Sequence, residues 1–468
     1  MTGKRKRKLA MPDTLIIVAL VVLLVAILSW IIPSGTYDYQ EMNINGRIRN
    51  VAIDGTYHTI DKSEVTTTGF LGFFSVLYRG CVEAADVIFM ILCCCGTFGV
   101  VVKTGAFHAG IGTILKKLKG KEILLVPIIM MIFGLGGSVF GMASEFYGFY
   151  PLIVGLGVAL GYDAMFGFAI IAVGEFVGFM GATLNPYSVG IAQTISGVEL
   201  YSGTGYRAIC FVIFMAISII YVMVYGRKIK KNPGASVVFG EKNIHAFDRD
   251  ELNEYSFTLK DGLVLLDVLV VLVVLMLGLI KWGWDFPQLC GLFLLMSMIA
   301  AAICKWSPNK WCSEFIDSAK TAMWGCILTG IAKAITVVMQ DAQIMDTVIY
   351  GLSNVLKNAP HAVSAQVMLV VQTLINFFIP SATGQASATM PIMAQLADII
   401  GVSRQTAVLA FQFGDGLSNI FWPTADIVII CGLGGISLQK WYKWFTPLFL
   451  ILFVTQAILL GIATGIGF

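Results

Sequence analysis

Apolar segments recur along almost the whole chain, and this pattern constrains the fold more than any other feature of the sequence. A helix of about 20 such residues crosses the hydrocarbon core of a bilayer. The chain has 468 residues, of which 57% are hydrophobic and 13% are charged, and its mean hydropathy is +0.83. A soluble domain carries roughly 25% charged residues. The sequence therefore predicts an all-α polytopic membrane protein whose surroundings are the lipid bilayer.

Nine bilayer crossings are expected. Two of them are split by helix breakers, namely Ala164–Ile195 and Thr406–Gly434. The uninterrupted spans are expected at Thr14–Ile32, Val87–Val102, Tyr206–Tyr225, Gly262–Ile280, Phe286–Ile303, Met323–Met339 and Trp444–Ile466. Amphipathic or interfacial helices are expected at Leu71–Ala85, Ala106–Lys121, Trp311–Ala322 and Ile344–Leu356, and a polar, strand-like loop at Ser34–Thr68.

Two further apolar segments, Ile123–Leu160 and Val363–Ile400, are interrupted by Gly, Ser and Pro. Neither half of either segment is well suited to cross the membrane by itself. Short apolar pieces of this kind are typical of re-entrant hairpins, in which two short helices meet at a non-helical tip inside the membrane. We place the two tips at Gly141–Glu145 and Thr383–Ser387.

The basic residues predict the orientation of the chain. The cluster Lys4–Lys8 precedes the first span, and a second basic cluster begins the polar segment Arg227–Asp261. Both are expected in the cytoplasm, with the chain in the cytoplasmic (inner) membrane. Nine crossings then place the C-terminus on the extracytoplasmic side. No nucleic-acid partner is expected, because the basic residues lie at segment ends rather than on one surface.

Gly and Pro recur at matched spacings in the two halves of the sequence. Pro151 is followed ten residues later by Gly161, and that glycine thirteen residues later by Gly174-Glu175; Pro391, Gly401 and Gly414-Asp415 repeat the pattern. The span Gly262–Ile280 has no counterpart in the first half, and this extra crossing inverts the second half across the membrane. The pattern therefore predicts inverted repeats, each with a hairpin and a broken helix, as in secondary transporters.

The expected divisions are 1–121 (first scaffold helices), 122–204 (first hairpin and broken helix), 205–226 (connecting span), 227–261 (cytoplasmic loop), 262–357 (second scaffold helices), 358–435 (second hairpin and broken helix) and 436–468 (last span).

Acidic residues lie inside these apolar segments. Glu175 and Asp415 occupy equivalent positions just before the two breaks, and Glu145 and Asp426 are also embedded. A charged group at the bilayer centre costs about 2.5–3.5 kcal/mol on insertion scales, so each acid needs a partner or a cavity. From residue 122 to 206 there is no Lys or Arg, and from 358 to 439 only Arg404. The acids are therefore expected to be protonated, or to pair with a substrate amine, Na⁺ or H⁺.

Small and hydroxyl residues surround the breaks and allow the backbone to approach a ligand. Close helix packing, for which membrane proteins use the same small residues, is the structural alternative. Any sodium ion is expected near Glu175, Asn185, Asp415 and Asn419, and no other cofactor is expected. The expected substrate-binding residues are Ser144, Glu145, Glu175, Asn185, Thr383, Gln385, Ser387, Asp415 and Asn419.

Several motifs carry a resemblance to a known family. The stretches FGMASEFYGFYP, GATLNPYSVGIAQ and IPSATGQASATMPIMAQLADIIGVSRQTAVLAFQFGDGLSN, with the opening IIPSGTYDY, resemble the YfcC-type members of the DcuC (C4-dicarboxylate anaerobic carrier) family. The resemblance implies a homodimeric elevator transporter, with the solute between the hairpin tips and the broken helices. The usual YfcC-type first tip carries two adjacent acids, whereas Ser144-Glu145 stands there in this chain.

The expected function is secondary active transport of an amino acid of the basic (arginine or ornithine) type, by exchange or ion coupling. The alternative is a Na⁺- or H⁺-coupled carrier of C4-dicarboxylates or other organic acids. A membrane enzyme or a channel is not favoured, because no nucleophile–base pair, metal-ligand spacing or nucleotide-binding loop is recognisable.

Overall fold

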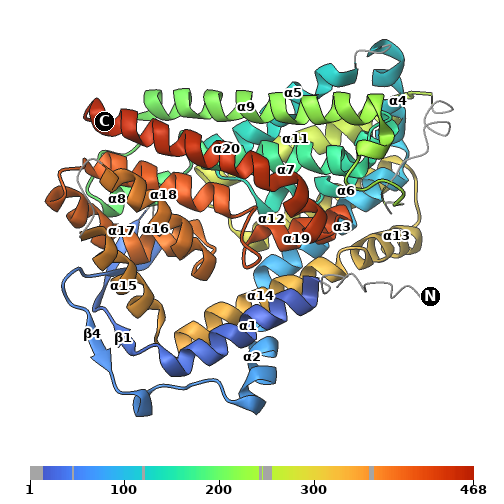
Figure 1. The fold of residues 1–468 in the computed structure, drawn as a ribbon. Coiled ribbons are helices and arrows are strands. Elements are labelled where there is room, and N and C mark those ends of the chain that lie inside the picture. Colours follow the sequence, from blue (N-terminus) through green and yellow to red (C-terminus); the bar gives the residue numbers. More distant parts are fainter. Residues whose placement is uncertain (1–13, 45–46, 119–121, 242–244, 246–255, 358–362) are drawn as a thin grey trace, which may run out of the picture.

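The structure is a computed structural model that describes residues 14–44, 47–118, 122–241, 245, 256–357 and 363–468 (Figure 1). Over this part of the chain, seven helices are long and apolar enough to cross a membrane. They are α1 (Thr14–Ile31), α3 (Ala85–Lys103), α9 (Thr204–Lys231), α11 (Leu259–Lys281), α12 (Phe286–Ile303), α14 (Met323–Asp341) and α20 (Leu438–Gly465). All seven uninterrupted spans expected from hydropathy are therefore confirmed as helices.

Shorter helices fill most of the remaining described chain. They are α2 (Phe70–Glu83), α4 (Ala106–Leu118), α5 (Leu125–Leu135), α6 (Phe149–Ala159), α7 (Ala164–Met180), α8 (Val189–Ile195), α13 (Pro308–Lys320), α15 (Met345–Lys357), α16 (Ser364–Phe378), α17 (Ala382–Ile399), α18 (Arg404–Ser418) and α19 (Asp426–Gly434). The four expected amphipathic or interfacial helices are α2, α4, α13 and α15. The basic cluster Lys4–Lys8 and the expected helix end Lys119–Lys121 lie outside the described residues.

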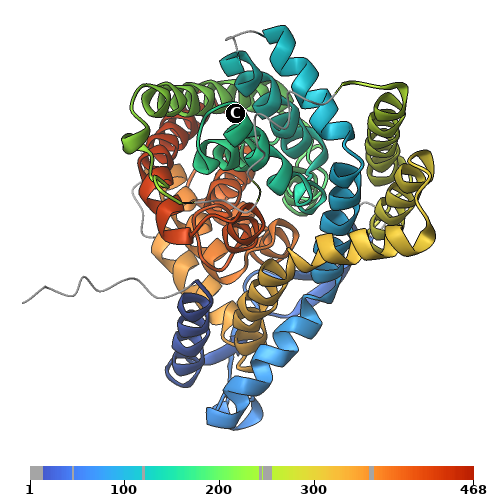
Figure 2. The same ribbon diagram turned by 90° about the vertical axis from the view of Figure 1, so that its right-hand side faces the viewer.

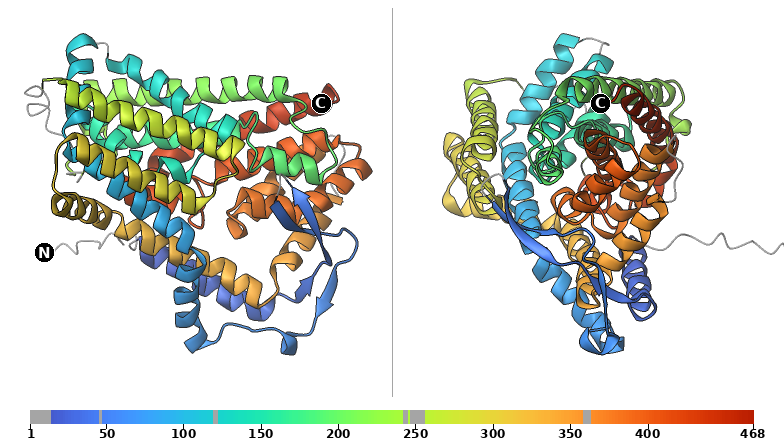
Figure 3. Two further views of the ribbon diagram at one scale, coloured as in Figure 1. Left: turned by 180° about the vertical axis from the view of Figure 1, so that it is seen from behind. Right: turned by 90° about the vertical axis from the view of Figure 1, so that its left-hand side faces the viewer.

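The first polar segment is not helical, so the chain is mainly rather than wholly α-helical. It forms two antiparallel ribbons, one from β1 (Ser34–Thr36) and β4 (His58–Ile60), the other from β2 (Tyr39–Ile44) and β3 (Arg47–Ala52). Strand-like alternation had predicted these pieces. The ribbons lie beside α15 and α17 at one end of the molecule (Figure 3).

Both predicted hairpin segments are interrupted helices. Between α5 and α6 the chain passes through a π-helical turn at Gly136–Phe140 and a short 3-10 turn at Ser144–Phe146. Between α16 and α17 only three residues, 379–381, are non-helical. Our placement of the second tip at Thr383–Ser387 is therefore wrong. Pro380 precedes an N-cap, Ser381, whose hydroxyl accepts from the Gly384 amide, so helix α17 has already begun at Ala382.

The two predicted split spans are also broken helices, and they form the centre of the fold. Every residue of α7 is buried, and so are residues 406–418 of α18. The two arms α5 and α6 pack against α7, as α16 and α17 pack against α18. Helices α7 and α18 cross where a Cβ on Gly416 would lie only 2.4 Å from the Met180 Cα. The broken helices are thus held together by close backbone contact.

The matched Gly markers have the same geometry in both halves. Gly161 and Gly401 have positive φ angles, 82° and 70°, just after α6 and α17, where a side chain would be strained. Each is followed by an N-cap: Asp163 accepts from the Phe166 amide and Ser403 from the Thr406 amide. Helices α2 to α9 and α13 to α20 follow one another in the same order. In both halves, the glycine thus follows the end of one helix and the N-cap begins the next.

Helices α1, α2 and α14 form a separate apolar group. Val22, Val25, Val76 and Val338 belong to a cluster that is distinct from the main core around α7 and α18. Figure 2 shows α1 and α2 in blue at the lower edge of the molecule, away from the green and red helices. At the α2–α14 crossing, a Cβ on Gly80 would lie 2.3 Å from the Gly330 carbonyl oxygen. These three helices therefore share an apolar cluster of their own, while α14 also packs against α19 and α3.

Helix α9 is longer than predicted. The basic run from Arg227 was expected to begin a loop, but the helix continues to Lys231, and Pro233 lies two residues beyond its end. Cations stabilise the carboxyl end of a helix, which explains the extension. Its 28 residues span about 42 Å at 1.5 Å per residue. Its first residues contact Phe468, so the C-terminus and the basic last turn lie at opposite ends (Figure 1).

One buried carboxylate fastens the ribbons to the helices. Asp346 accepts hydrogen bonds from the Tyr39 hydroxyl (2.8 and 2.9 Å), the Tyr37 amide (3.0 Å) and the Thr36 hydroxyl (3.1 Å). Burial, and next the neighbouring Asp346, raise the pKa of Tyr39, so its hydroxyl remains the donor.

We expect Asp346→Asn to release this loop. Each hydrogen bond to a charged group contributes about 1.5–3 kcal/mol, and the amide removes the charge and one of the acceptor oxygens. Limited proteolysis of the purified protein should cleave residues 34–68 several-fold faster in the variant. Asp38→Asn, in the same loop and exposed, is the matched control. Equal cleavage of both variants would contradict the role of Asp346 as the anchor.

Candidate functional site

A cavity of about 530 Å³ lies between the α1–α2–α14 body and the broken helices. One wall comes from α2 and α14, and the other from both hairpin tips and the α18–α19 junction. Its polar and charged lining residues are Glu83, Ser144, Tyr147, Thr329, Lys333, Thr336, Gln340, Ser381, Asn419, Thr424 and Asp426. The cavity thus brings together residues that are more than 300 positions apart in the sequence.

The first tip is shaped by a close backbone approach. Gly141 has a φ of 67°, and a Cβ there would lie 2.3 Å from Asn185 Oδ1. That oxygen accepts from the Tyr187 and Ser188 amides (2.9 and 3.2 Å), which turns the chain after α7. The tip therefore rests directly on the first helix break, and Ser144 reaches the cavity.

The second helix break is held by an amide. Asn376 Nδ2 donates to the Asp415 carbonyl (3.1 Å), the Ser418 hydroxyl (2.6 Å) and Asn419 Oδ1 (2.8 Å). The Thr424 hydroxyl also donates to the Phe377 carbonyl at 2.7 Å. The first of these bonds satisfies a carbonyl at the end of α18, and the last satisfies one at the end of α16. They orient Asn419 towards the cavity.

Asp426 opens α19 at the cavity wall. The Tyr147 hydroxyl donates to its Oδ1 at 2.6 Å. The carboxylate lies in the first turn of the helix, where the helix dipole favours a negative charge. Asp426 thus presents a carboxylate to the cavity that is held in place by Tyr147.

Of the nine expected substrate-binding residues, Ser144 and Asn419 line this cavity. The other seven are not among its lining residues, and each is buried or forms a hydrogen bond within the protein. Three of them accept hydrogen bonds: Glu145 from the Ala143 amide, Glu175 from the Tyr150 hydroxyl (2.9 Å) and Asn185 from two backbone amides. Three donate hydrogen bonds: Thr383 to the Tyr187 carbonyl, Gln385 to Gln372 and Ser387 to the Thr383 carbonyl. Asp415 is buried within α18.

Glu175 and Asp415 were expected to approach the same central region. Their helices do pack against each other, and both residues are fully buried. Within the described chain, Glu175 Oε1, both Asp415 carboxylate oxygens and Asn185 Nδ2 are buried without a hydrogen-bond partner. Over the same residues, no group of three or more His, Cys, Asp or Glu side chains is arranged to hold a metal ion.

Sequence reasoning missed the charged residues of the opposite wall. Lys333 lies in the apolar helix α14, on one face with Thr329, Thr336 and Gln340. The signal was present, since these residues are spaced four, three and four positions apart, which places them on one helical stripe. Glu83, at the end of α2, completes this wall.

A second missed cation is Arg207. It follows the Lys- and Arg-free stretch by one residue and is only 1% exposed in α9. Its Nε and Nη2 donate to the Thr183 carbonyl (3.3 and 3.2 Å), just beyond the end of α7. A guanidinium at that position stabilises the carboxyl end of the helix. Arg207 therefore supports the break from outside the cavity.

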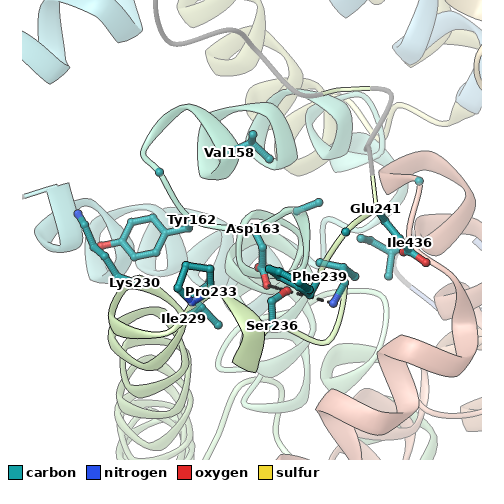
Figure 4. Close-up of a pocket in the computed structure, with 15 residues that line it drawn as sticks. Val158, Tyr162, Asp163, Ile229, Lys230, Pro233, Ser236, Phe239, Glu241 and Ile436 are labelled. Carbon is teal, nitrogen blue, oxygen red and sulfur yellow. Dashed lines mark hydrogen bonds between the residues drawn. The ribbon is translucent and has the colours of Figure 1, made fainter.

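A second cavity, of about 480 Å³, lies at the base of the first hairpin (Figure 4). Asp163 Oδ2 accepts from the hydroxyls of Tyr225 and Ser236 (2.5 and 2.6 Å). Lys230 lies over the Tyr162 ring, and Glu241 pairs with Lys440. Each charged side chain of this lining thus has a partner, so the central cavity is the better candidate for binding a charged solute.

Comparisons with known proteins identify the family. The model of the family described as "C4-dicarboxylate anaerobic carrier" (DcuC) matches residues 11–465. An Escherichia coli K12 protein named "Putative basic amino acid antiporter YfcC" is 32% identical, and the alignment covers 100% of this chain and 99% of that protein. An uncharacterized protein of Haemophilus influenzae is 27% identical, with 99% of each chain covered.

Two solved transporter structures give weaker matches. YdaH of Alcanivorax borkumensis is 15% identical with a TM-score of 0.44, covering 98% of this chain and 99% of that one. MtrF of Neisseria gonorrhoeae is 16% identical with the same TM-score, 0.44, covering 97% and 96%. Likenesses of this size do not establish a common fold. The family match, which spans nearly the whole chain, shows that this multi-pass membrane transporter is a YfcC-type member of the DcuC (C4-dicarboxylate anaerobic carrier) family.

Proposed function

We propose that the protein is a secondary active transporter of an amino acid of the basic type, such as arginine or ornithine. The observation that carries this proposal is the charge of the central cavity. Two carboxylates, Glu83 and Asp426, and one ammonium, Lys333, line it, which leaves one excess negative charge. A basic amino acid carries two cationic groups and one carboxylate, the complementary set. The name of the Escherichia coli relative agrees with this substrate class.

The movement that we propose is an elevator, in which the broken helices and hairpins carry the solute past the α1–α2–α14 body. Two features support it. Residues of α1, α2 and α14 form an apolar cluster apart from the main core, and the cavity is lined by α2 and α14 on one side and by the hairpin tips and the α18–α19 junction on the other. The matching element order of α2–α9 and α13–α20 supports an inverted repeat, which is typical of such transporters. We also expect a homodimer in the inner membrane, with the N-terminus cytoplasmic and the C-terminus outside. Light scattering of the purified protein, and labelling of cysteines added at each end, check these expectations.

We propose that the coupling ion, Na⁺ or H⁺, is held beside the cavity by Glu175, Asn185, Asp415 and Asn419. A buried carboxylate without a donor is costly unless a proton or a cation neutralises it. Both oxygens of Asp415 and one of Glu175 meet this description within the described chain. Pure exchange without a coupling ion is the other form of the same proposal.

Organic-acid transport is the alternative function, and one observation favours it. The amino end of α17 faces the cavity through Ser381, Ala382 and Gly384, and helix amino ends bind anions. Lys333 would add a positive charge. A dicarboxylate would, however, have to bind beside Glu83 and Asp426 without a cation of its own.

Transport in proteoliposomes tests the proposal. Vesicles loaded with unlabelled arginine should accumulate labelled arginine, and lysine or ornithine outside should compete. A sodium gradient and a pH gradient, imposed separately, identify the coupling ion, while pure exchange responds to neither. Competition by succinate without competition by ornithine would reject the basic amino acid in favour of the organic acid.

A further inference from the structure

One face of α14 carries polar groups within a membrane-spanning helix. Thr329, Lys333, Thr336 and Gln340 all line the cavity. The stripe extends about 17 Å along the helix axis, at 1.5 Å per residue. The charge of Lys333 is costly at membrane depth unless something compensates it. Close packing of α14 with other helices does not require a lysine, so the residue calls for a functional explanation.

Lys333 has no ion-pair partner within the described chain. Asp341, the last residue of α14, pairs with Arg79 of α2. Glu83 lines the same cavity, but the two side chains form no ion pair. Asp426, on the opposite wall, accepts from Tyr147 instead. The ammonium is therefore available to a solute.

The position of Lys333 is rigid relative to α2. Gly80 and Gly330 bring the two backbones into contact one turn away from it, and Ala334 and Ile335 belong to the α1–α2–α14 apolar cluster. Asp426 and Asn419 belong to the other body. A solute in the cavity thus meets a fixed ammonium on one side and a carboxylate on the other.

We propose that Lys333 is a specificity-determining residue that binds the substrate's carboxylate, while Asp426 across the cavity binds its amino group. The inference rests on the proposed function, since it takes the solute to be an amino acid. A zwitterion neutralises both walls at once. An amine without a carboxylate leaves the ammonium unpaired, and a site built for a polar group rejects a ligand that lacks it. Lys333 therefore distinguishes amino acids from the corresponding amines.

Arginine and its decarboxylated analogue agmatine test this assignment, because they differ only in the carboxylate. Binding to the purified full chain is measured by competition with labelled arginine. The wild type should bind arginine at least tenfold more tightly than agmatine. Lys333→Gln should bind the two within about threefold of each other, because the carboxylate no longer has its partner. Lys333→Arg, which keeps the charge, should restore the discrimination and shows that the site still folds.

Lys320→Gln is the matched control, because Lys320 is exposed on α13 and its ion pair within the described residues is with Asp317. It should discriminate like the wild type. Equal binding of arginine and agmatine by the wild type, or full discrimination by Lys333→Gln, would overturn the role of Lys333 but not the proposed function. If the wild type binds neither ligand, the proposed function fails, and this inference fails with it.

Discussion

Gly178→Val is expected to abolish the folded transporter. A Cβ at Gly178 would lie 2.1 Å from the Gly134 carbonyl oxygen and 2.5 Å from the Gly134 Cα. Both atoms belong to backbone, so no side chain can rotate away. Overpacking of a core costs about 1–3 kcal/mol and sometimes more, and a backbone clash in a fully buried helix belongs at the upper end. The first arm would have to leave α7, which opens the tip beside the cavity.

Size-exclusion chromatography and thermal unfolding of the detergent-purified protein measure this effect. We expect Gly178→Val to yield aggregate or no purified protein. Gly205→Val is the matched control, because Gly205 lies in the spanning helix α9 and a Cβ there would meet nothing within 4 Å. It should elute and unfold like the wild type. A monodisperse Gly178→Val protein with an unchanged Tm would show that α5 and α7 do not cross this closely.

Asp426→Asn is expected to lower arginine exchange by roughly thirtyfold to one hundredfold. This loss corresponds to one charge-assisted hydrogen bond of about 2–2.7 kcal/mol between the carboxylate and a substrate cation. Asparagine has nearly the same shape, and its Oδ1 can still accept from the Tyr147 hydroxyl. The substitution therefore removes the charge and leaves the helix start in place.

Initial rates of labelled arginine uptake into arginine-loaded proteoliposomes check this prediction. Asp317→Asn is the control, since Asp317 is exposed on α13 and its ion pair within the described chain is with Lys320. Its rate should stay within about twofold of the wild type, the range of an exposed pair. An Asp426→Asn protein that unfolds like the wild type and exchanges arginine at the normal rate would remove Asp426 from the site.

Hydropathy predicted the spanning helices because their determinant is local. A run such as Phe286–Ile303 is apolar over its whole length, and its helix has the expected bounds. Helix ends also depend on neighbouring residues, as the N-caps Asp163 and Ser403 illustrate. The second tip was misplaced because Ser and Thr fit equally well into a loop and into the first turn of a helix.

The matched markers predicted a repeated unit, but they did not predict which acids line the cavity. Gly174 and Gly414 recur because each contacts the first arm of its hairpin, α5 or α16. A Cβ on Gly174 would lie 3.0 Å from the Met130 Cα, and a Cβ on Gly414 would lie 2.9 Å from the Gln372 Cβ. Glu175 and Asp415 follow these glycines along the sequence and are buried with them. The matched Gly spacing thus identified positions where helices contact each other. The acids next to these glycines were predicted to line the cavity, but they do not.

The sequence by itself determined the polytopic helical class, the positions of the spans and the places where helices break. These follow from the solvation of each segment and from its own Gly, Pro and capping residues. Only the tertiary structure brought Lys333 and Glu83 opposite Asp426. No local pattern records such a meeting, because it depends on how the α1–α2–α14 body packs beside helices that are distant in the chain, and packing of that kind is decided by shape.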